Sequence, residues 1–363
     1  MRVLKIDVPS FAYLIGYQLF KRCPDSTECR VFKFTFGDID LKYIFAQEHF
    51  YVDVMGRKFS AEGVMHIYQR TISGFNLFYS LEDFLVFYTI VSIQARKFGI
   101  CLRGMCMMID HLHLLASAAN RMQMAGFISA YTSLYVREFN AHTGRTGPLF
   151  EPLYGSAMKM EMKKIRSAII YMFNNAVEKR LCPKAEDYRW NFLKYYNPEK
   201  TRPIRRKKDL SRRLQRALKI TDNAYKSGEY LRYALLRRLY KGLDSQEKEL
   251  LTDYIITLYF PFRKDMPCKY FKSYQDMVTA VNSNTGSEYD IIEKHYCKSD
   301  VPYREMTKYL KRKGITDAKT LISESDEVKQ RYFTMLRENT SGTAVQVRKF
   351  LHIHHHAKGK SST

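Results

Sequence analysis

The sequence has few of the residues that disulfide scaffolds and cysteine metal sites require. Its 363 residues contain seven cysteines, an odd number, and no two of them are spaced as Cys-x-x-Cys. A disulfide framework needs paired cysteines, and a cysteine zinc site needs closely spaced ones. Both are therefore excluded, and we expect reduced thiols.

The sequence also lacks a hydrophobic run that could cross a membrane. The longest apolar stretch, FLVFYTIVSI at residues 84–93, is about half the length that a bilayer span requires, and it is typical of a buried helix. The first residues, MRVLKIDVPS, contain no sustained apolar segment and no small-residue cleavage site. We therefore expect a cytoplasmic protein with no membrane partner.

Acidic residues are too few to balance the basic ones. The chain has 60 Lys and Arg against 37 Asp and Glu, which gives a formal net charge of +23 at pH 7. A surplus of this size attracts polyanions, so nucleic acid is the first expected partner and an anionic membrane surface the second. Most of the 27 Tyr and 23 Phe are expected in the core, and some could stack on exposed bases.

Three regions follow from the pattern along the chain. Residues 1–57 have no assignable motif and are treated as an N-terminal extension of unknown role. Residues 58–200 contain strand patterns at 64–72, 100–108 and 111–117 and helix patterns from Ser80 to about residue 98, from 121 to 142 and from 161 to 181. Because these strands fall in adjacent pairs, the expected class is α+β with a mainly antiparallel sheet. Residues 201–363 predict a basic, all-helical region.

Two histidines in the strand at 111–117 form the first candidate site. His111 and His113 are separated by one residue, and side chains i and i+2 of a strand lie on the same face. Both imidazoles can therefore reach one ion, and neutral imidazole suits divalent metals. A His-x-His pair is common, however, and by itself is more often structural.

A tyrosine on the helix at 161–181 forms the second candidate. Tyr171 lies outside the apolar stripe of this helix, which predicts an exposed phenol, and Asn175 projects beside it one turn later. The amide oxygen of Asn175 could therefore serve a metal near the hydroxyl. A surface tyrosine on a solvated helix face is the alternative interpretation. The apolar stripe consists of Ile165, Ala168, Ile169, Met172, Phe173 and Ala176.

Five blocks of sequence, in order, resemble the REP-associated branch of the single-tyrosine DNA transposases of the HUH superfamily. They are MIDHLHLLAS, FISAYTSLYVREFN, GRTGPLFEPLYGS, YMFNNAVEKRL and EDYRWNFLKYY, and the similarity covers about residues 63 to 196. Five blocks in the family's order are more specific than any single one. The resemblance implies a ferredoxin-like HUH domain with a central antiparallel sheet, two histidines on one strand and a nucleophilic tyrosine on a following helix.

The resemblance also implies a role for individual residues. It implies that His111, His113 and Asn175 are the metal ligands and that Tyr171 is the nucleophile. In the block GRTGPLF it implies a loop near the DNA, to which Gly144, Arg145 and Phe150 belong.

The chain departs from the family pattern beside these residues. The family usually has Pro-Asn before the first histidine, where this chain has Ile109 and Asp110. The types of ligand and the nucleophile are intact, but the geometry of the hairpin is open. Asn174 or Glu178 stays open as a substitute for Asn175.

The resemblance implies metal-dependent cleavage and rejoining of single-stranded or hairpin DNA. The tyrosine would be linked to a 5′-phosphate, a 3′-hydroxyl would be released, and Mg²⁺ or Mn²⁺ would neutralise charge on the phosphodiester. We expect a nucleoid-associated bacterial transposase or a domesticated relative of one. Since related enzymes differ in whether the tyrosine helix serves its own subunit or a partner, a homodimer stays open.

The third region begins with the densest basic cluster. Its helical continuation could track a phosphate backbone, while a solvated basic helix is the alternative. Residues 301–315 and 343–353 each resemble part of a helix-turn-helix that would bind duplex or hairpin DNA. The residues of the cluster for which we predict DNA binding are Arg205, Arg206, Lys207, Lys208, Arg212 and Arg213.

Two other functions compete with the transposase. One is a catalytically idle protein that keeps the HUH scaffold to bind hairpin DNA or regulate a locus. Retention of both histidines, Tyr171 and Asn175 favours the enzyme over it. The other, an HUH nickase for replication or conjugation, is disfavoured because the blocks match transposases and no helicase motif is present.

Overall fold

The computed structural model describes residues 59–197, 210–284 and 299–354 and, before them, the backbone of three strands. These strands pair in chain order into an antiparallel sheet. They lie within the region that has no assignable motif, and they are β1 (Arg30–Phe36), β2 (Ile39–Ala46) and β3 (His49–Val54).

A second antiparallel sheet, of four strands, organises the rest of the chain. Its central strands β6 and β4 pair along their whole length, although β5 lies between them in the sequence. The predicted α+β class with a central antiparallel sheet is therefore confirmed. In spatial order the strands are β5 (Cys101–Met107), β6 (His111–Ser117), β4 (Val64–Arg70) and β7 (Gly155–Lys159).

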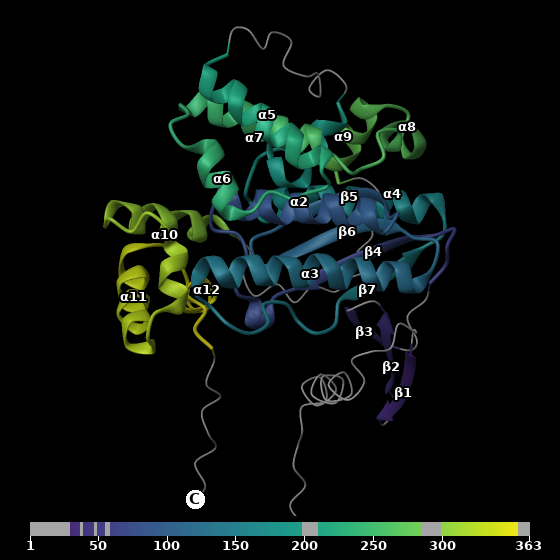
Figure 1. Ribbon diagram of the computed structural model, residues 1–363, viewed down its shortest axis with the longest axis horizontal. Coiled ribbons are helices and arrows are strands. Elements are labelled where there is room, and N and C mark those ends of the chain that lie inside the picture. The colour runs from purple at the N-terminus through teal and green to yellow at the C-terminus, as the bar shows by residue number, and fades with distance from the viewer. Residues whose placement is uncertain are drawn as a thin grey trace, which may run out of the picture.

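Helices cover both faces of this sheet (Figure 1). The three that contact it are α2 (Leu81–Lys97), α3 (Arg121–Thr143) and α4 (Met162–Glu178). After α4 the chain continues through short 3₁₀ turns η2 (Ala185–Asp187), η3 (Arg189–Asn191) and η4 (Leu193–Tyr196) into helices α5 (Arg212–Lys226), α6 (Tyr233–Tyr240), α7 (Ser245–Leu258), α8 (Met266–Tyr270) and α9 (Tyr274–Asn282). A further 3₁₀ turn, η1 (Ile72–Gly74), follows β4.

The start of α2 and the end of α3 lie at the residues that local sequence signals predict. Ser80 and Asp83 form a capping box at the start of α2, and the side chain of Asn120 accepts a hydrogen bond from the backbone of Gln123 at the start of α3. Gly144 ends α3 in the left-handed conformation, with a φ of 71°, which glycine adopts without steric cost.

The two faces of the sheet follow from strand alternation. Gln69 of β4 donates to Thr132 of α3 (Nε2 to Oγ1, 3.1 Å) and accepts from the hydroxyl of Tyr131 (3.0 Å), so α3 covers its face. On the opposite face, a Cβ at Gly104 of β5 would lie 2.3 Å from Cε of Met172 on α4. The absence of a side chain at position 104 therefore leaves room for the end of the Met172 side chain where α4 packs on the sheet.

Helices α5 to α9 extend the same hydrophobic core rather than building a separate one. Buried Leu214, Leu236 and Ile255 belong to one cluster with the residues of the sheet. Tyr88 of α2 also donates its hydroxyl to the carbonyl of Ile256 (2.7 Å). Residues 58–200 and the helices from 210 to 282 therefore share one core across the predicted boundary at residue 200.

The last helices form a smaller core of their own, which we call the C-terminal unit (residues 299–354). Its buried residues include Met306, Leu336, Val347 and Phe350, and of the described residues buried in this cluster Ile109 alone comes from the sheet domain. Figure 1 shows the unit at one end of the molecule, beside one end of α3. It consists of α10 (Val301–Arg312), η6 (Ala318–Ser323), α11 (Asp326–Asn339) and α12 (Ala344–Leu351).

Polar contacts fix the C-terminal unit to the sheet domain. Lys319 lies 2.7 Å from Asp83 (Nζ to Oδ1), and the two side chains are 2% and 0% exposed. Tyr79 donates its hydroxyl to the carbonyl of Phe350 at 2.6 Å. Breaking a buried ion pair leaves a desolvated charge behind, so the unit has one favoured position on the sheet domain.

No helix in the described part of the chain is long and apolar enough to cross a membrane. Residues 84–93 lie within α2, where nearly all of them are buried, as the sequence predicts.

His352, after α12, must stay neutral for the unit to dock. It is 4% exposed, donates from Nε2 to the carbonyl of Asn76 (2.9 Å), and stacks on Phe75 with ring centroids 4.5 Å apart. Burial is the main cause that lowers the pKa of His352 to about 3; the hydrogen bond to the carbonyl of Asn76 opposes it, and the charges of Arg145, Lys329 and His354 act in the same direction as burial.

We predict that the free energy of unfolding decreases on acidification through His352. A depressed histidine pKa means that the unfolded chain binds a proton first, so this contribution is complete above pH 6.5 and is lost toward pH 3. Between about pH 7 and about pH 5 the free energy of unfolding should decrease by about 2 kcal/mol through this group. Urea unfolding of wild type and His352→Gln, which keeps a donor for Asn76, measures it; equal pH dependence in both proteins would contradict the prediction.

Candidate active site

The two histidines of β6 lie on the face of the sheet that α4 covers. His111 and His113 have ring centroids 5.2 Å apart and are 7% and 0% exposed. In the register with β4, His113 is opposite Tyr68 and His111 is opposite Arg70. Strand alternation therefore places both imidazoles on one face, as predicted. The ring of Tyr68 and the guanidinium of Arg70 belong to the neighbouring strand.

Tyr171 lies beside these histidines, but it is not exposed. Its ring packs edge-on against His113 at 5.6 Å between centroids, and it is 3% exposed. The predicted exposed phenol is therefore wrong. The apolar stripe accounts for only part of the buried surface of α4, because Asn174, on another side of the helix, donates to the carbonyl of Val281 in α9 (2.8 Å). Helix α4 is enclosed between the sheet and the later helices.

Asn175 is the residue of α4 whose amide meets the histidines. Its Nδ2 lies 3.3 Å from Nε2 of His113, and its Oδ1 is buried with no hydrogen-bond partner among the described residues. Of the two substitutes left open, Asn174 is bonded to α9 and Glu178 is exposed. Since an amide can turn its oxygen toward a neighbouring ion, the orphaned oxygen fits a metal ligand.

His66 is a site residue that the sequence reasoning missed. Its Nε2 lies 3.1 Å from Nδ1 of His113, and its ring is 5.9 Å from that of Tyr171 between centroids. The hydrogen bond fixes the orientation of the His113 ring. The signal was present in the strand VMHIYQR, where alternation places His66, Tyr68 and Arg70 on one face, but only strand pairing shows that this face adjoins His113.

Asp110, in the turn before β6, orients the other histidine. Its Oδ1 lies 2.6 Å from Nδ1 of His111, and its Oδ2 lies 3.0 Å from Nζ of Lys349. Burial raises the pKa of Asp110, but the hydrogen bond and charge of His111 and the charge of Lys349 outweigh burial and hold the pKa well below its usual range. The carboxylate is therefore ionised and accepts a hydrogen bond from Nδ1 of His111.

The metal ligands implied by the resemblance stay a prediction. No group of three or more His, Cys, Asp or Glu that could hold a metal occurs in the ranges that the structure describes. A metal at this site would thus be held by His111, His113 and the amide oxygen of Asn175. Two imidazoles and one amide oxygen suit Mn²⁺ or Mg²⁺ better than a soft metal.

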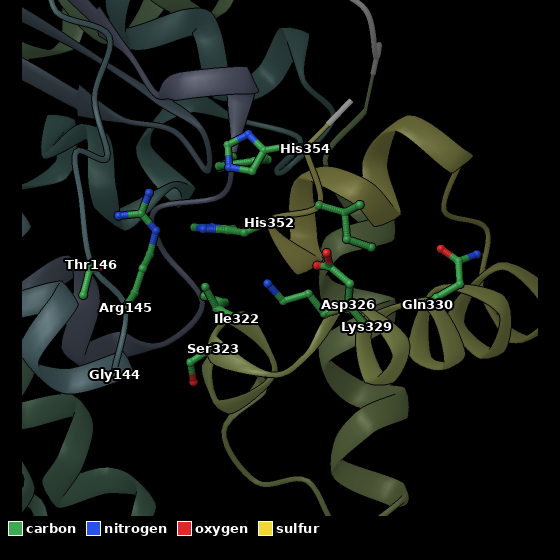
Figure 2. Close-up of a pocket in the computed structure, with 12 residues that line it drawn as sticks. Gly144, Arg145, Thr146, Ile322, Ser323, Asp326, Lys329, Gln330, His352 and His354 are labelled. Atoms are coloured by element: carbon green, nitrogen blue, oxygen red, sulfur yellow. The ribbon is translucent and has the colours of Figure 1, made fainter. Parts of the chain in front are cut away.

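Arg145 stabilises its own loop. Its guanidinium donates to Oδ1 of Asn140 (3.1 Å) and to the carbonyls of Gly147 (3.0 Å) and Pro148 (2.6 Å). The loop borders a cavity of about 510 Å³ between the sheet domain and the C-terminal unit. Figure 2 shows Arg145 on one side of it, Lys329 on the other and the ring nitrogens of His352 directed toward Arg145. DNA binding by Arg145 stays a prediction.

The basic cluster lies only partly within the described residues. Arg205, Arg206, Lys207 and Lys208 lie outside them. Arg212 and Arg213 are exposed in the first turn of α5, and Arg213 donates to the carbonyl of Gly242 (3.0 Å). Leucines and alanines of α5 face the core, so its basic residues face solvent, as a DNA-binding helix requires.

The two candidate helix-turn-helix segments have different surroundings. Residues 301–312 form α10, and residues 344–351 form α12. The apolar side of α12, with Val347, Phe350 and Leu351, is buried in the core of the C-terminal unit, while Lys349 contacts Asp110. This side of α12 is thus occupied, and duplex binding by the unit stays a prediction.

We predict that His66→Ala lowers the affinity for Mn²⁺ by about ten- to a hundredfold, because the partner that orients a ligating histidine is lost. Titration of the metal-free protein with Mn²⁺, followed by electron paramagnetic resonance, measures the affinity. Gln69→Ala, on the other face of β4, is the control and should bind Mn²⁺ as wild type does. Unchanged affinity in His66→Ala would show that His66 does not orient a ligand.

Comparison with known proteins supports the family assignment. Residues 66–168 match the model of the family described as "Transposase IS200 like". The matched segment contains His66, His111 and His113 and ends three residues before Tyr171. A search of curated proteins and a search of solved structures gave no match. The REP-associated branch stays a prediction. Over residues 66–168 the chain is therefore similar to the IS200-like transposases, and this match supports the predicted HUH-superfamily transposase.

Proposed function

We propose that this protein cuts and rejoins single-stranded DNA through Tyr171, with a divalent metal held by His111, His113 and Asn175. The observation that carries the proposal is the meeting of these four side chains from two elements, β6 and α4, at the centre of the sheet. The match to a transposase family supports DNA cleavage in general. The tyrosine mechanism, the metal and the hairpin-flanked substrate are our proposal.

In this mechanism the phenolic oxygen of Tyr171 attacks the phosphorus of a phosphodiester. The bond from phosphorus to the 3′ oxygen breaks, the phenol loses its proton and the leaving 3′ oxygen takes up one, so that a 5′-phosphotyrosine and a 3′-hydroxyl remain. A second 3′-hydroxyl then attacks the phosphotyrosine and restores Tyr171. Because the phosphoester is exchanged and not hydrolysed, rejoining requires no ATP.

The residues around Tyr171 position it for this exchange. The rings of His113 and His66 pack edge-on against the tyrosine ring, at 5.6 and 5.9 Å between centroids, which restricts the direction of the hydroxyl. Arg70, opposite His111 on β4, provides a positive charge for the scissile phosphate. When bound, the divalent ion supplies charge neutralisation at the phosphate.

The affinity for DNA would come from basic surface outside the site. Helix α5 presents exposed Arg212, Arg213 and Arg216, and phosphate contacts from such residues release counterions. Single strands or hairpin ends suit the site because the backbone of an unpaired strand can enter between packed elements. A bacterial transposase, nucleoid-associated or domesticated, is the proposed setting, and a homodimer stays open.

One observation favours a second candidate function. Tyr171 is 3% exposed, whereas a nucleophile must reach phosphorus. A protein that keeps the scaffold and binds hairpin DNA without cutting it would tolerate an enclosed tyrosine. The two functions differ in one product, the covalent adduct between protein and DNA.

We predict that wild type forms a covalent adduct with labelled single-stranded hairpin DNA in the presence of Mn²⁺ and that Tyr171→Phe forms none, because the phenylalanine has no oxygen to attack. A denaturing gel separates the adduct. Tyr131→Phe is a matched control, since Tyr131 is also buried but lies on the opposite face and bonds Gln69; its adduct should equal that of wild type. An adduct from Tyr171→Phe would refute this nucleophile, and none from wild type across many hairpins would favour the idle regulator.

We predict that the double variant Arg212→Gln, Arg216→Gln weakens binding of single-stranded DNA. It should reduce the slope of log affinity against log salt by about one for each phosphate contact that is lost. Fluorescence anisotropy over a series of salt concentrations measures the slope. Arg263→Gln is the control, because Arg263 is exposed but already paired with Asp265 (2.6 Å). An equal change for each charge removed in both proteins would show that only net charge matters.

A further inference from the structure

The C-terminal unit reaches the candidate metal site through one side chain. Nζ of Lys349, on α12, lies 3.0 Å from Oδ2 of Asp110, and the two side chains are 15% and 21% exposed. The other oxygen of Asp110 is 2.6 Å from Nδ1 of His111. A lysine, a carboxylate and a histidine are therefore linked in series, from the last helix of the chain to the strand that carries the candidate ligands.

Asp110, in the middle of this series, determines which nitrogen of His111 carries the proton and how the plane of its ring is oriented. A carboxylate accepts hydrogen bonds and does not donate them, so the proton of the imidazole lies on Nδ1 and the lone pair lies on Nε2. Fixing one nitrogen also fixes the plane of the ring. If the carboxylate rotated, both the plane and the direction of the Nε2 lone pair would be lost.

Asp110 has one partner on each side that limits its rotation. Its backbone carbonyl accepts from the backbone of Thr71 at 3.3 Å, which holds the turn. Its side chain is held by His111 at one oxygen and by Lys349 at the other. Without Lys349 only the histidine that is to be oriented would hold the carboxylate.

The position of Lys349 is itself fixed by the docking of the unit. The side chain of Ile109, next to Asp110, is buried in the core of the C-terminal unit. The backbone of Asn76 donates to the carbonyl of Lys349 at 3.3 Å. The turn before β6 is thus joined to the C-terminal unit by an apolar contact and to α12 by an ion pair, and the backbone hydrogen bond joins α12 to the segment after η1. The turn is also where this chain has Ile109 and Asp110 in place of the usual Pro-Asn.

A second acid adds to the negative charge around Asp110. Asp300, at the start of α10, is 5% exposed, and burial together with the charge of Asp110 raises its pKa to about 6. The charges of Lys179, His111 and Lys349 act in the opposite direction. Lys349 is therefore one of the cations that balance two neighbouring carboxyl groups.

We propose that Lys349 is a positioning residue for the metal site: it holds Asp110 so that His111 presents Nε2, which makes the C-terminal unit a part of that site. The proposal rests on the proposed function, since it takes His111 as a ligand. It predicts that loss of Lys349 lowers metal affinity even in the absence of DNA and while the unit remains docked.

The test compares two lysines of the C-terminal unit that both form ion pairs with the sheet domain. Lys349→Gln should weaken binding of Mn²⁺ to the full chain by about tenfold, and Lys349→Arg should restore most of the affinity. Lys319→Gln breaks the ion pair with Asp83, which is not part of the series that leads to His111. This variant should lower the melting temperature but leave the Mn²⁺ affinity at the wild-type value. Electron paramagnetic resonance gives the affinity and circular dichroism the melting temperature.

The outcomes separate this inference from the function on which it rests. If His111→Ala binds Mn²⁺ as wild type does, the proposed ligand set is wrong. If His111→Ala loses the metal but Lys349→Gln keeps it, or if Lys319→Gln loses as much as Lys349→Gln, the positioning role is overturned. Asp110→Ala gives a second measurement should Lys349→Gln unfold: it removes the acceptor for Nδ1 of His111 and should lower the affinity as well, and Lys349→Arg should not rescue it. Wild-type affinity in Asp110→Ala would also overturn the proposal.

Discussion

The close contact between α4 and one face of the four-stranded sheet is the constraint on which the candidate site depends. Gly104 favours it, because a Cβ there would lie 2.3 Å from Cε of Met172 and would displace the end of that side chain. At this separation Tyr171 meets His113, and Asn175 brings its amide within 3.3 Å of the same ring. A helix held farther from the sheet would carry the same residues but could not place a phenol and an amide beside the histidines.

The same packing encloses the residue that the chemistry would have to expose. Helices from the later part of the chain cover α4, and the resulting core is continuous from the sheet to residue 281. Tyr171 can therefore meet a phosphate only if a strand of DNA enters beside the sheet or a neighbouring element moves. This enclosure also excludes bulk water from the histidines, which strengthens electrostatic interactions there.

The C-terminal unit shows how a region with its own core can still belong to a site. Its apolar residues pack among themselves, yet its polar contacts point outward to the sheet domain: Lys319 to Asp83, Lys349 to Asp110 and His352 to Asn76. Apolar contacts alone tolerate sliding, whereas buried ion pairs and hydrogen bonds require one geometry. The unit is thereby held in register with the turn that precedes His111.

The sequence by itself determined what depends on local periodicity and order: the α+β class, the limits of α2, α3 and α4, the shared face of His111 and His113, and the similarity to a transposase family, which the match over residues 66–168 supports. Only the tertiary structure decided that Tyr171 is buried, that His66 bonds His113 and that Lys349 bonds Asp110. Alternation and helical spacing specify the direction of a side chain relative to its own element. They contain no information on which distant element covers that side, and Asp110 and Lys349 are 239 residues apart in the chain.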